Sequence, residues 1–422
     1  MDERELESNR SYAILRNRDL RLYLSGRLIA VIGQQMLAIA IGWELFFRTH
    51  SLMKLSYVGL TQVAPMILFT LPAGHVADSY NRKRIITLMT LVVAISSLGL
   101  AIISKYQASI LWMYACLFVS AAARTFLTAA SASFLPSLVE RKDLSRAVNW
   151  SATTFQFSSI VGPAIFSGLI WFAGHKAYPI YIINFFAAII FCVMMTQIHT
   201  HHVVANREKM SFKTLLTGFN FVFANKIILG IISLDMFAVL LGGATALLPV
   251  YTELILKVGP EWLGFLQMAL PIGSFLCTFI LAHRPPIQKA GHSLLWAVTG
   301  FGVATIGFGL SRWFWLSFSM LFICGVVDNI SVVVRHTLVQ LLTPDDKRGR
   351  VSAVNNLFIG TSNEMGEFES GAVAQLLGPV IGNSRSVGAV LSVVIGGFGT
   401  IGVVIAIALI FPQIRKYGRL DA

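Results

Sequence analysis

Charged residues are scarce in this sequence, and that scarcity excludes a water-soluble protein. Only 13% of the 422 residues are Asp, Glu, Lys or Arg, whereas 55% are hydrophobic and the mean hydropathy is +0.71. A soluble surface needs far more charge than this. Apolar runs of roughly 20 or more residues recur along the chain, and each is long enough to cross a bilayer as a helix. Because the runs are continuous and do not alternate with polar residues, they exclude a membrane β-barrel.

Motifs of enzymatic chemistry are also missing. The sequence has no His-Glu-x-x-His metal motif, no Gly-x-Ser-x-Gly nucleophile turn and no Gly-x-x-x-x-Gly-Lys phosphate loop. We therefore expect no enzyme, no cofactor and no use of ATP. The four cysteines lie within apolar runs without metal-type spacing, so no metal site is expected. His199, His201 and His202 are interpreted as a polar loop, with a metal cluster as the alternative.

The apolar runs predict an all-α polytopic membrane protein with twelve spans in two pseudo-symmetric six-helix bundles. Residues 1–198 are the expected N-terminal bundle, 199–226 a central cytoplasmic loop, and 227–422 the C-terminal bundle. Within the loop, apolar residues from Phe212 to Phe223 recur at helical spacing, which indicates a short helix in the interface plane. The predicted spans are 19–47, 55–78, 85–104, 110–136, 147–172, 179–198, 227–252, 261–282, 292–310, 314–342, 351–377 and 388–412.

The basic residues predict the orientation. With the N-terminus in the cytoplasm, the inner segments carry 21 Lys and Arg and the outer loops 7. Cytoplasmic loops carry such an excess, so both termini are expected to be cytoplasmic and the number of spans even. The net charge of +13 is concentrated in these short loops, which argues against nucleic acid as a partner and for a lipid bilayer.

The two halves resemble each other. Leu135–Asn149 follows the fourth predicted span and Leu338–Asn355 the tenth, and each segment combines acidic and basic residues before entering a helix through Val-Asn. The offset is 203 residues at the start and 206 at the end. A six-plus-six duplication is a transporter architecture, with the substrate site at the interface of the repeats.

A charged loop between the second and third predicted spans is the most informative motif. It reads Gly74-His-Val-Ala-Asp78-Ser-Tyr-Asn81-Arg82-Lys83-Arg84. We expect Asp78 and Arg82 to lie within reach across a tight turn and to latch helices on the cytoplasmic side, together with Gly74, Lys83 and Arg84. An ordinary positively charged loop is the alternative. Asn81 is expected to adopt a left-handed conformation, which Asn tolerates better than most residues.

This loop resembles the cytoplasmic signature loop of the major facilitator superfamily, with Asn81 where that pattern has Gly. The twelve spans, the central loop and the repeat resemble the same family over the whole chain. The segments 335–350 and 366–371 resemble the bacterial branch that includes the enterobactin exporter and transmembrane secretion effectors. The resemblance implies a monomeric transporter of the bacterial inner membrane that exports a small molecule by alternating access, driven by protons. The equivalent loop of the second half, His283–Lys289, lacks the Gly-x-x-x-Asp core, so a latch there must be built differently.

Charges at membrane depth are functional-site hypotheses, because each costs at least roughly 2.5–3.5 kcal/mol at the bilayer centre. Arg124 and Asp328 lie near the middle of the fourth and tenth predicted spans, 204 residues apart, which matches the repeat offset. We expect them to face each other across a central cavity and to pair there; separate structural roles are the alternative. Arg335 lies two helical turns after Asp328 on the same face. Asp235 in the seventh predicted span is a further candidate.

The eleventh predicted span contains three carboxylates, Glu364, Glu367 and Glu369. Glu364 and Glu367 share one helix face. Burial makes a carboxylate a proton carrier, so either of these two is expected to carry the coupling proton. Hydrogen bonding between helices is the alternative.

Sparse polar groups in an aromatic setting predict an amphipathic substrate of siderophore or drug type. The expected cavity residues are Gln34, Gln35, Gln156, Asn329 and Phe126. Gly162-Pro163 resembles the Gly-Pro signature of the superfamily's antiporters, and it indicates a hinge or a tight seal. Translocation of lysophospholipids and proton-coupled uptake of a small solute are the competing functions. The sequence leaves open the substrate, the direction of transport and the identity of the coupling ion.

Overall fold

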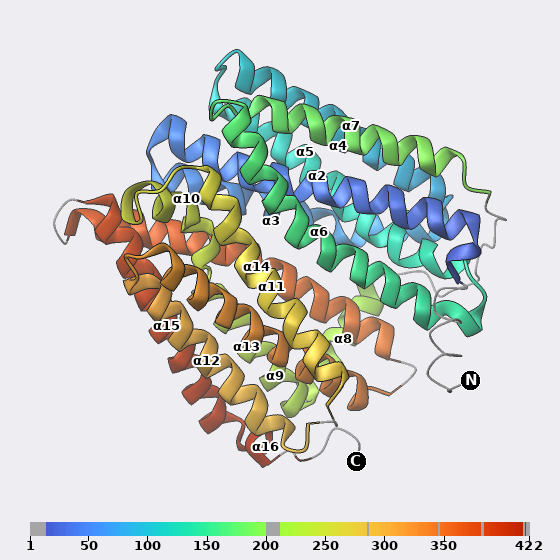
Figure 1. The fold of residues 1–422 in the computed structure, drawn as a ribbon. Coiled ribbons are helices and arrows are strands. Elements are labelled where there is room, and N and C mark those ends of the chain that lie inside the picture. Colours follow the sequence, from blue (N-terminus) through green and yellow to red (C-terminus); the bar gives the residue numbers. More distant parts are fainter. Residues whose placement is uncertain are drawn as a thin grey trace. The chain divides into compact units, whose positions relative to one another are not determined.

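Six long helices make up most of the described residues in the first half of the chain (Figure 1). The computed structural model describes residues 14–199, 212–284, 287–344, 347–380, 384–416 and 418. The helices are α2 (Arg18–Thr49), α3 (Leu52–Ser79), α4 (Arg82–Lys105), α5 (Ile110–Phe134), α6 (Leu144–Phe172) and α7 (Tyr178–Thr196). Local sequence sets several of their ends: the Ser109 hydroxyl accepts from Leu111 N at the start of α5, and Pro179 occupies the first turn of α7.

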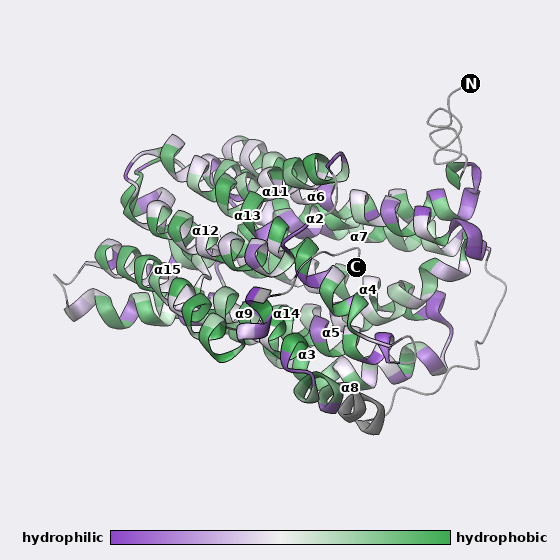
Figure 2. Cartoon of the chain, turned by 90° about the horizontal axis from the view of Figure 1, so that it is seen from below, coloured by the Kyte–Doolittle hydropathy of each residue, from purple (hydrophilic) through white to green (hydrophobic). Residues whose placement is uncertain are grey.

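Among the described residues of the second half, six further helices are long and three are shorter. They are α8 (Phe212–Ala224), α9 (Lys226–Leu241), α10 (Leu248–Val250), α11 (Glu261–Ala282), α12 (Ala290–Leu310), α13 (Phe314–Leu341), α14 (Arg348–Val380), α15 (Arg385–Ile410) and α16 (Pro412–Lys416). Hydrophobic residues predominate along α12 and α15 (Figure 2). The described residues form no strand.

Contacts divide the chain into two compact units. The first consists of Met1–Ile41 and Ala64–Ser211, and the second of Gly42–Val63 and Phe212–Ala422, as far as these residues are described. Helix α2 therefore starts in the first unit and ends in the second. Helix α3 starts in the second unit and ends in the first. Residues 200–211 of the predicted central loop, including His201 and His202, lie outside the described residues.

Among the described residues, eleven helices or helical segments are long and apolar enough to cross a membrane. They match eleven of the predicted spans to within about three residues at most ends; for example, 55–78 was expected and α3 covers Leu52–Ser79. The remaining predicted span corresponds to α14, which is 33 residues long but carries Glu364, Glu367 and Glu369. The chain is thus an all-α, multi-pass membrane protein.

The seventh predicted span is broken, although an unbroken helix over 227–252 was expected. The regular α-helix α9 ends at Leu241, and Gly242 and Gly243 lead into a 3-10 turn at Ala244–Leu247. After α10, the segment Tyr251–Ile255 is π-helical. Two successive glycines lack the side-chain packing and the conformational restriction that keep a helix regular, so the break occurs there.

Each unit has an apolar core. In the first unit, Tyr23, Phe134 and Phe191 pack together with buried aliphatic residues, and the Tyr23 and Phe134 ring centroids are 5.4 Å apart. In the second unit, one cluster joins Leu234 of α9 to Val334 and Leu338 of α13. Burial of such side chains contributes roughly 1.5–3 kcal/mol each in a water reference.

Helix α8 packs against protein along one face. Val222 is fully buried in a cluster with Val354 of α14, and the rings of Phe219 and Phe358 meet edge to face at 5.9 Å. Phe223 remains exposed. This helix is therefore docked on α14 through its apolar face, in the segment where the sequence indicates a helix.

Candidate functional site

A buried ion pair joins α9 to α13 in the second unit. Nη1 of Arg335 donates to a carboxylate oxygen of Asp235, and the two side chains are 4% and 8% exposed. The neighbouring residues Leu234 and Val334 are fully buried, so the pair lies in apolar surroundings. A charge in such a place is costly unless it is paired.

The charge balance of the ion pair depends on one proton, that of the Asp235 carboxyl group. While Asp235 is ionised, the two charges neutralise each other inside the unit. Protonation of Asp235 would leave the Arg335 charge without its counterion, and Nε of Arg335 already has no hydrogen-bond partner among the described residues. Loss of one charge therefore favours any rearrangement that gives Arg335 water or another acid.

Asp328 occupies a different environment on the same helix. It is half-buried, and its carboxylate forms no ion pair or hydrogen bond with the described residues. The neighbouring Asn329 accepts a hydrogen bond from Thr278 of α11 at 3.2 Å. Arg124 is half-buried in α5 of the first unit, so the predicted pairing of Arg124 with Asp328 connects residues of different units and stays a prediction.

The acidic stretch of α14 packs against two irregular or glycine-containing segments of the second unit. A Cβ on Gly243, at the break after α9, would lie 2.4 Å from the Gly366 carbonyl oxygen. A Cβ on Gly59 of α3 would lie 2.3 Å from the Glu364 carbonyl oxygen and 3.1 Å from Cβ of Glu367. Glycine is thus required for backbones to approach α14 this closely. Glu364 and Glu367 are both half-buried beside these crossings.

Polar groups of α2 face α6 in the first unit. Gln35 donates to the Ser159 hydroxyl at 2.9 Å, and Arg27 donates to Ser151 at 2.5 Å. A Cβ on Gly162 would lie 2.6 Å from Cβ of Gln35, so Gly162 allows the two helices to approach within this unit. The Gly162-Pro163 pair, predicted to form a hinge or seal, is buried at this crossing.

The other predicted cavity residues of the first unit are only partly engaged. Gln34 is half-buried and makes no side-chain hydrogen bond with the described residues. Gln156 is half-buried on α6. Phe126 packs at the edge of the first unit's core, 6.0 Å from the ring of Phe69. Of this group, Gln34 is the amide most available to a ligand.

The charged loop is held by backbone carbonyls, not by the expected Asp78–Arg82 contact. Arg82 donates to the carbonyl oxygens of Ala77 at 3.3 Å and Ser133 at 3.1 Å. Asp78 is half-buried and forms no ion pair with the described residues, and Gly74 is buried. Arg82 therefore ties the turn to the end of α5, because a guanidinium satisfies several helix-end carbonyls at once.

The expectation of a left-handed Asn81 was wrong. Its φ is −63° and its ψ 110°, which is the extended conformation of a helix N-cap, and its side chain accepts from Arg84 N at 3.4 Å. N-cap residues need this geometry, and Asn is among the preferred ones. Lys83 and Arg84 then occupy the first turn of α4.

Two features escaped the sequence reasoning. Asp235 and Arg335 were each candidates, but nothing connected them, because they are 100 residues apart and the repeat offset pairs Asp328 with Arg124 instead. Arg27 was not considered, although a basic residue inside the first apolar run was a visible signal.

The chain resembles membrane transporters over most of its length. A profile of the Major Facilitator Superfamily matches residues 23–366. Curated proteins named enterobactin exporter EntS, from Escherichia coli O1:K1 / APEC and from Shigella boydii serotype 18, are 24% identical over 377 residues, which cover 87% of this chain and 88% of theirs. A bacterial homologue of the human lysosomal transporter Spinster, in an inward-facing conformation, has a TM-score of 0.72 at 14% identity and covers 94% of this chain and 97% of its own. A bacterial homologue of the iron transporter ferroportin has a TM-score of 0.65 at 14% identity, covering 92% and 98%.

Proposed function

Because the chain belongs to the Major Facilitator Superfamily, we propose that it is a proton-coupled secondary active exporter of amphipathic small molecules that works by alternating access. Both resemblances found in the sequence, to the superfamily and to the branch with the enterobactin exporter, are confirmed. The match to curated exporters over 87% of the chain is the observation that supports export as the direction of transport. The siderophore that names these relatives makes a siderophore-like solute the first substrate to test.

The proposed location is the bacterial inner membrane, with both termini in the cytoplasm and the protein acting as a monomer. The Escherichia coli exporters that match 87% of this chain support the membrane, and the distribution of Lys and Arg supports the orientation. In this orientation the loop between α3 and α4 is cytoplasmic.

Proton coupling is assigned to the second unit. Asp235 is the proposed proton-binding residue, because protonation of its carboxylate would remove the counterion of Arg335. Glu364 and Glu367 are the second proposed proton carriers, and Arg124 and Asp328 are proposed to exchange partners as the cavity changes sides. Substrate is proposed to contact Gln34, Gln156 and Asn329.

Transport into inverted membrane vesicles tests the proposal. Vesicles with an imposed pH gradient, acidic inside, should accumulate a catecholate siderophore or an amphipathic drug, and collapse of the gradient should abolish the accumulation. Asp235→Asn should uncouple accumulation from the gradient, whereas Asp143→Asn, at a carboxylate in the α5–α6 connection, should leave it unchanged. Accumulation that follows an imposed Na⁺ gradient alone would reject proton coupling.

Vesicles of both orientations separate the competing functions. Gradient-dependent movement of a fluorescent lysophospholipid, with no transport of siderophores or drugs, would replace the leading proposal by lipid translocation. Accumulation only in right-side-out vesicles would establish uptake.

A further inference from the structure

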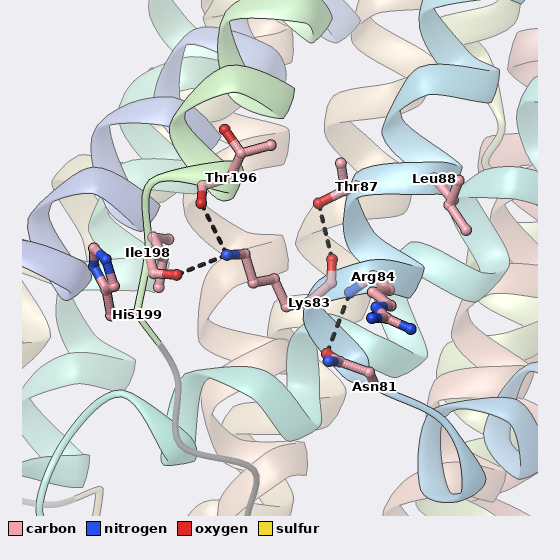
Figure 3. A pocket seen from close by; sticks show the side chains of 8 residues that line it. All are labelled: Asn81, Lys83, Arg84, Thr87, Leu88, Thr196, Ile198 and His199. Carbon is pink, nitrogen blue, oxygen red and sulfur yellow. Dashed lines mark hydrogen bonds between the residues drawn. The ribbon is translucent and has the colours of Figure 1, made fainter.

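A cavity of about 720 Å³ opens between the ends of α4 and α7 in the first unit (Figure 3). None of the described residues that line it is acidic. They are Asn81, Lys83, Arg84, Thr87, Leu88, Thr196, Ile198 and His199. We call this cavity the α4–α7 pocket.

Lys83 and Arg84, the two cationic residues of α4 that line the pocket, differ in their contacts. Nζ of Lys83 donates to the carbonyl oxygens of Thr196 at 2.9 Å and Ile198 at 2.7 Å, so it caps the end of α7 and keeps one further N–H. Figure 3 shows Arg84 on the opposite side of the first turn of α4 from Lys83. The Arg84 guanidinium is exposed and has no hydrogen bond or ion pair with the described residues.

The positive charge of this helix end is only partly compensated, because Arg82 and Lys83 donate to helix-end carbonyls whereas the Arg84 guanidinium does not. Arg82, Lys83 and Arg84 begin α4, and its first turn contains no acidic residue. The N-terminus of a helix carries a partial positive charge, so three cations there repel both the helix dipole and one another. Phosphate groups bind at such helix ends, and an arginine fork adds paired hydrogen bonds to them.

An acid does approach the rim of the pocket, but it is already engaged. Asp19 accepts from the backbone N–H of His199 at 3.2 Å. The His199 side chain is exposed at the same rim. Among the described residues, the charge in and around the α4–α7 pocket therefore remains net positive.

Exposed apolar residues continue from the pocket along both helices. Sγ of Cys192 donates to the Thr87 carbonyl oxygen at 3.5 Å, and Nδ2 of Asn184 donates to the Ser97 hydroxyl at 2.7 Å. These two contacts align α4 and α7 as antiparallel neighbours. These contacts place Leu88 beside residues 191–193 and Ile95 beside residues 184–186. The exposed apolar residues are Leu88, Leu91 and Ile95 on α4 and Phe186, Ile190 and Val193 on α7.

We propose that the α4–α7 pocket binds the phosphate of an anionic phospholipid whose acyl chains lie along the exposed apolar residues of α4 and α7. Both helices are membrane spans by length and composition, so their shared end lies at headgroup depth. Basic pockets between spans recognise acidic lipid headgroups, and each cation near the membrane surface contributes about 1 kcal/mol. A water-soluble phosphate would gain nothing from the apolar stripe above the pocket, and this favours the lipid.

Lipid binding to the purified full-length protein tests the proposal without reference to transport. Native mass spectrometry with added phosphatidylglycerol should give a dissociation constant at least tenfold lower than phosphatidylcholine gives. Arg84→Gln should weaken phosphatidylglycerol binding about fivefold, the change expected from one lost cation. Arg84→Lys should recover part of the loss, because it restores the charge without the fork.

Arg141→Gln is the matched control, because Arg141 is also exposed, lies at a helix junction of the same unit and is outside the pocket. Leu88→Ser should weaken phosphatidylglycerol binding, because it removes part of the apolar stripe that the acyl chains would contact. The proposal is overturned if Arg84→Gln binds phosphatidylglycerol as wild type does, if phosphatidylcholine binds equally well, or if inorganic phosphate displaces the lipid at equal concentration. The last outcome would identify a soluble anion as the ligand.

Discussion

The two units stabilise buried polarity in different ways. In the first unit, the polar side chains of α2 donate to hydroxyls of α6, as Arg27 does to Ser151 and Gln35 to Ser159. In the second unit, Asp235 and Arg335 neutralise each other in an apolar core. A bond to a serine hydroxyl persists in every protonation state, whereas an ion pair depends on one proton. We therefore propose that the α2–α6 contacts of the first unit are insensitive to protonation, whereas the ion pair of the second unit responds to it.

The largest effect is expected from breaking the ion pair. Arg335→Ala leaves the Asp235 charge buried without a partner and should lower the free energy of unfolding by roughly 3–5 kcal/mol. Thermal unfolding of the purified protein in detergent, followed by intrinsic fluorescence, measures the change.

The apolar double variant Asp235→Leu/Arg335→Met is the control for this prediction. It removes both charges while keeping volume, so stability should recover and proton-coupled transport should not. If Arg335→Ala is as stable as wild type, the ion pair is solvated. The proposed difference between the buried contacts of the two units would then be lost.

A smaller loss is expected in the first unit. Ser151→Ala deprives the half-buried Arg27 of its acceptor, and hydrogen bonds to charged groups contribute roughly 1.5–3 kcal/mol. The coupling energy from the cycle Arg27→Ala, Ser151→Ala and the double variant measures this contact. The energy should be the same at pH 6 and pH 8. A marked change with pH would mean that the first unit, too, contains a proton-sensitive element.

The approach of α3 to α14 gives a third test. Gly59→Ala introduces a Cβ about 2.3 Å from the Glu364 carbonyl oxygen and should cost roughly 1–3 kcal/mol of stability and lower transport. Gly168→Ala is the matched control, since no atom lies within 4 Å of a Cβ there. Both substitutions raise helix propensity equally, so the difference between the two melting temperatures isolates the clash. Equal melting temperatures would indicate that α14 can move away at little cost.

Hydropathy predicts the helices well because each span must be apolar over a length that the bilayer fixes. The errors fall where that requirement is relaxed. The start of α14 at Arg348 was predicted three residues late, because Arg348 and Arg350 are polar enough to resemble a loop. The break at Gly242-Gly243 was missed, although two adjacent glycines in an apolar run were visible, because hydropathy does not report backbone regularity.

The candidate site was predicted only as separate residues. A charge within an apolar run is visible in the sequence, so Asp235 and Arg335 could be found one by one. Their pairing depends on which faces of α9 and α13 pack together, and helical spacing within one segment carries no such information. The duplicated architecture suggested a different partner for Asp328, and that suggestion concerns residues of separate units.

The smallest effect concerns Asn81, where sequence reasoning and the structure disagree about the backbone. If Asn81 were left-handed, Asn81→Gly would stabilise the turn, since glycine adopts that conformation without strain. With φ at −63° and a side chain that caps α4, Asn81→Gly should instead cost a few tenths of a kcal/mol and Asn81→Ala about 1 kcal/mol. Melting temperatures of the two variants decide between these geometries, and a glycine variant more stable than wild type would contradict the N-cap. The cap orders the turn that carries Arg82, Lys83 and Arg84. The alanine variant should therefore also weaken the hydrogen bonds from Arg82 to the end of α5 and from Lys83 to the end of α7. Faster backbone hydrogen exchange around Ser133 and Ile198 would report this loss.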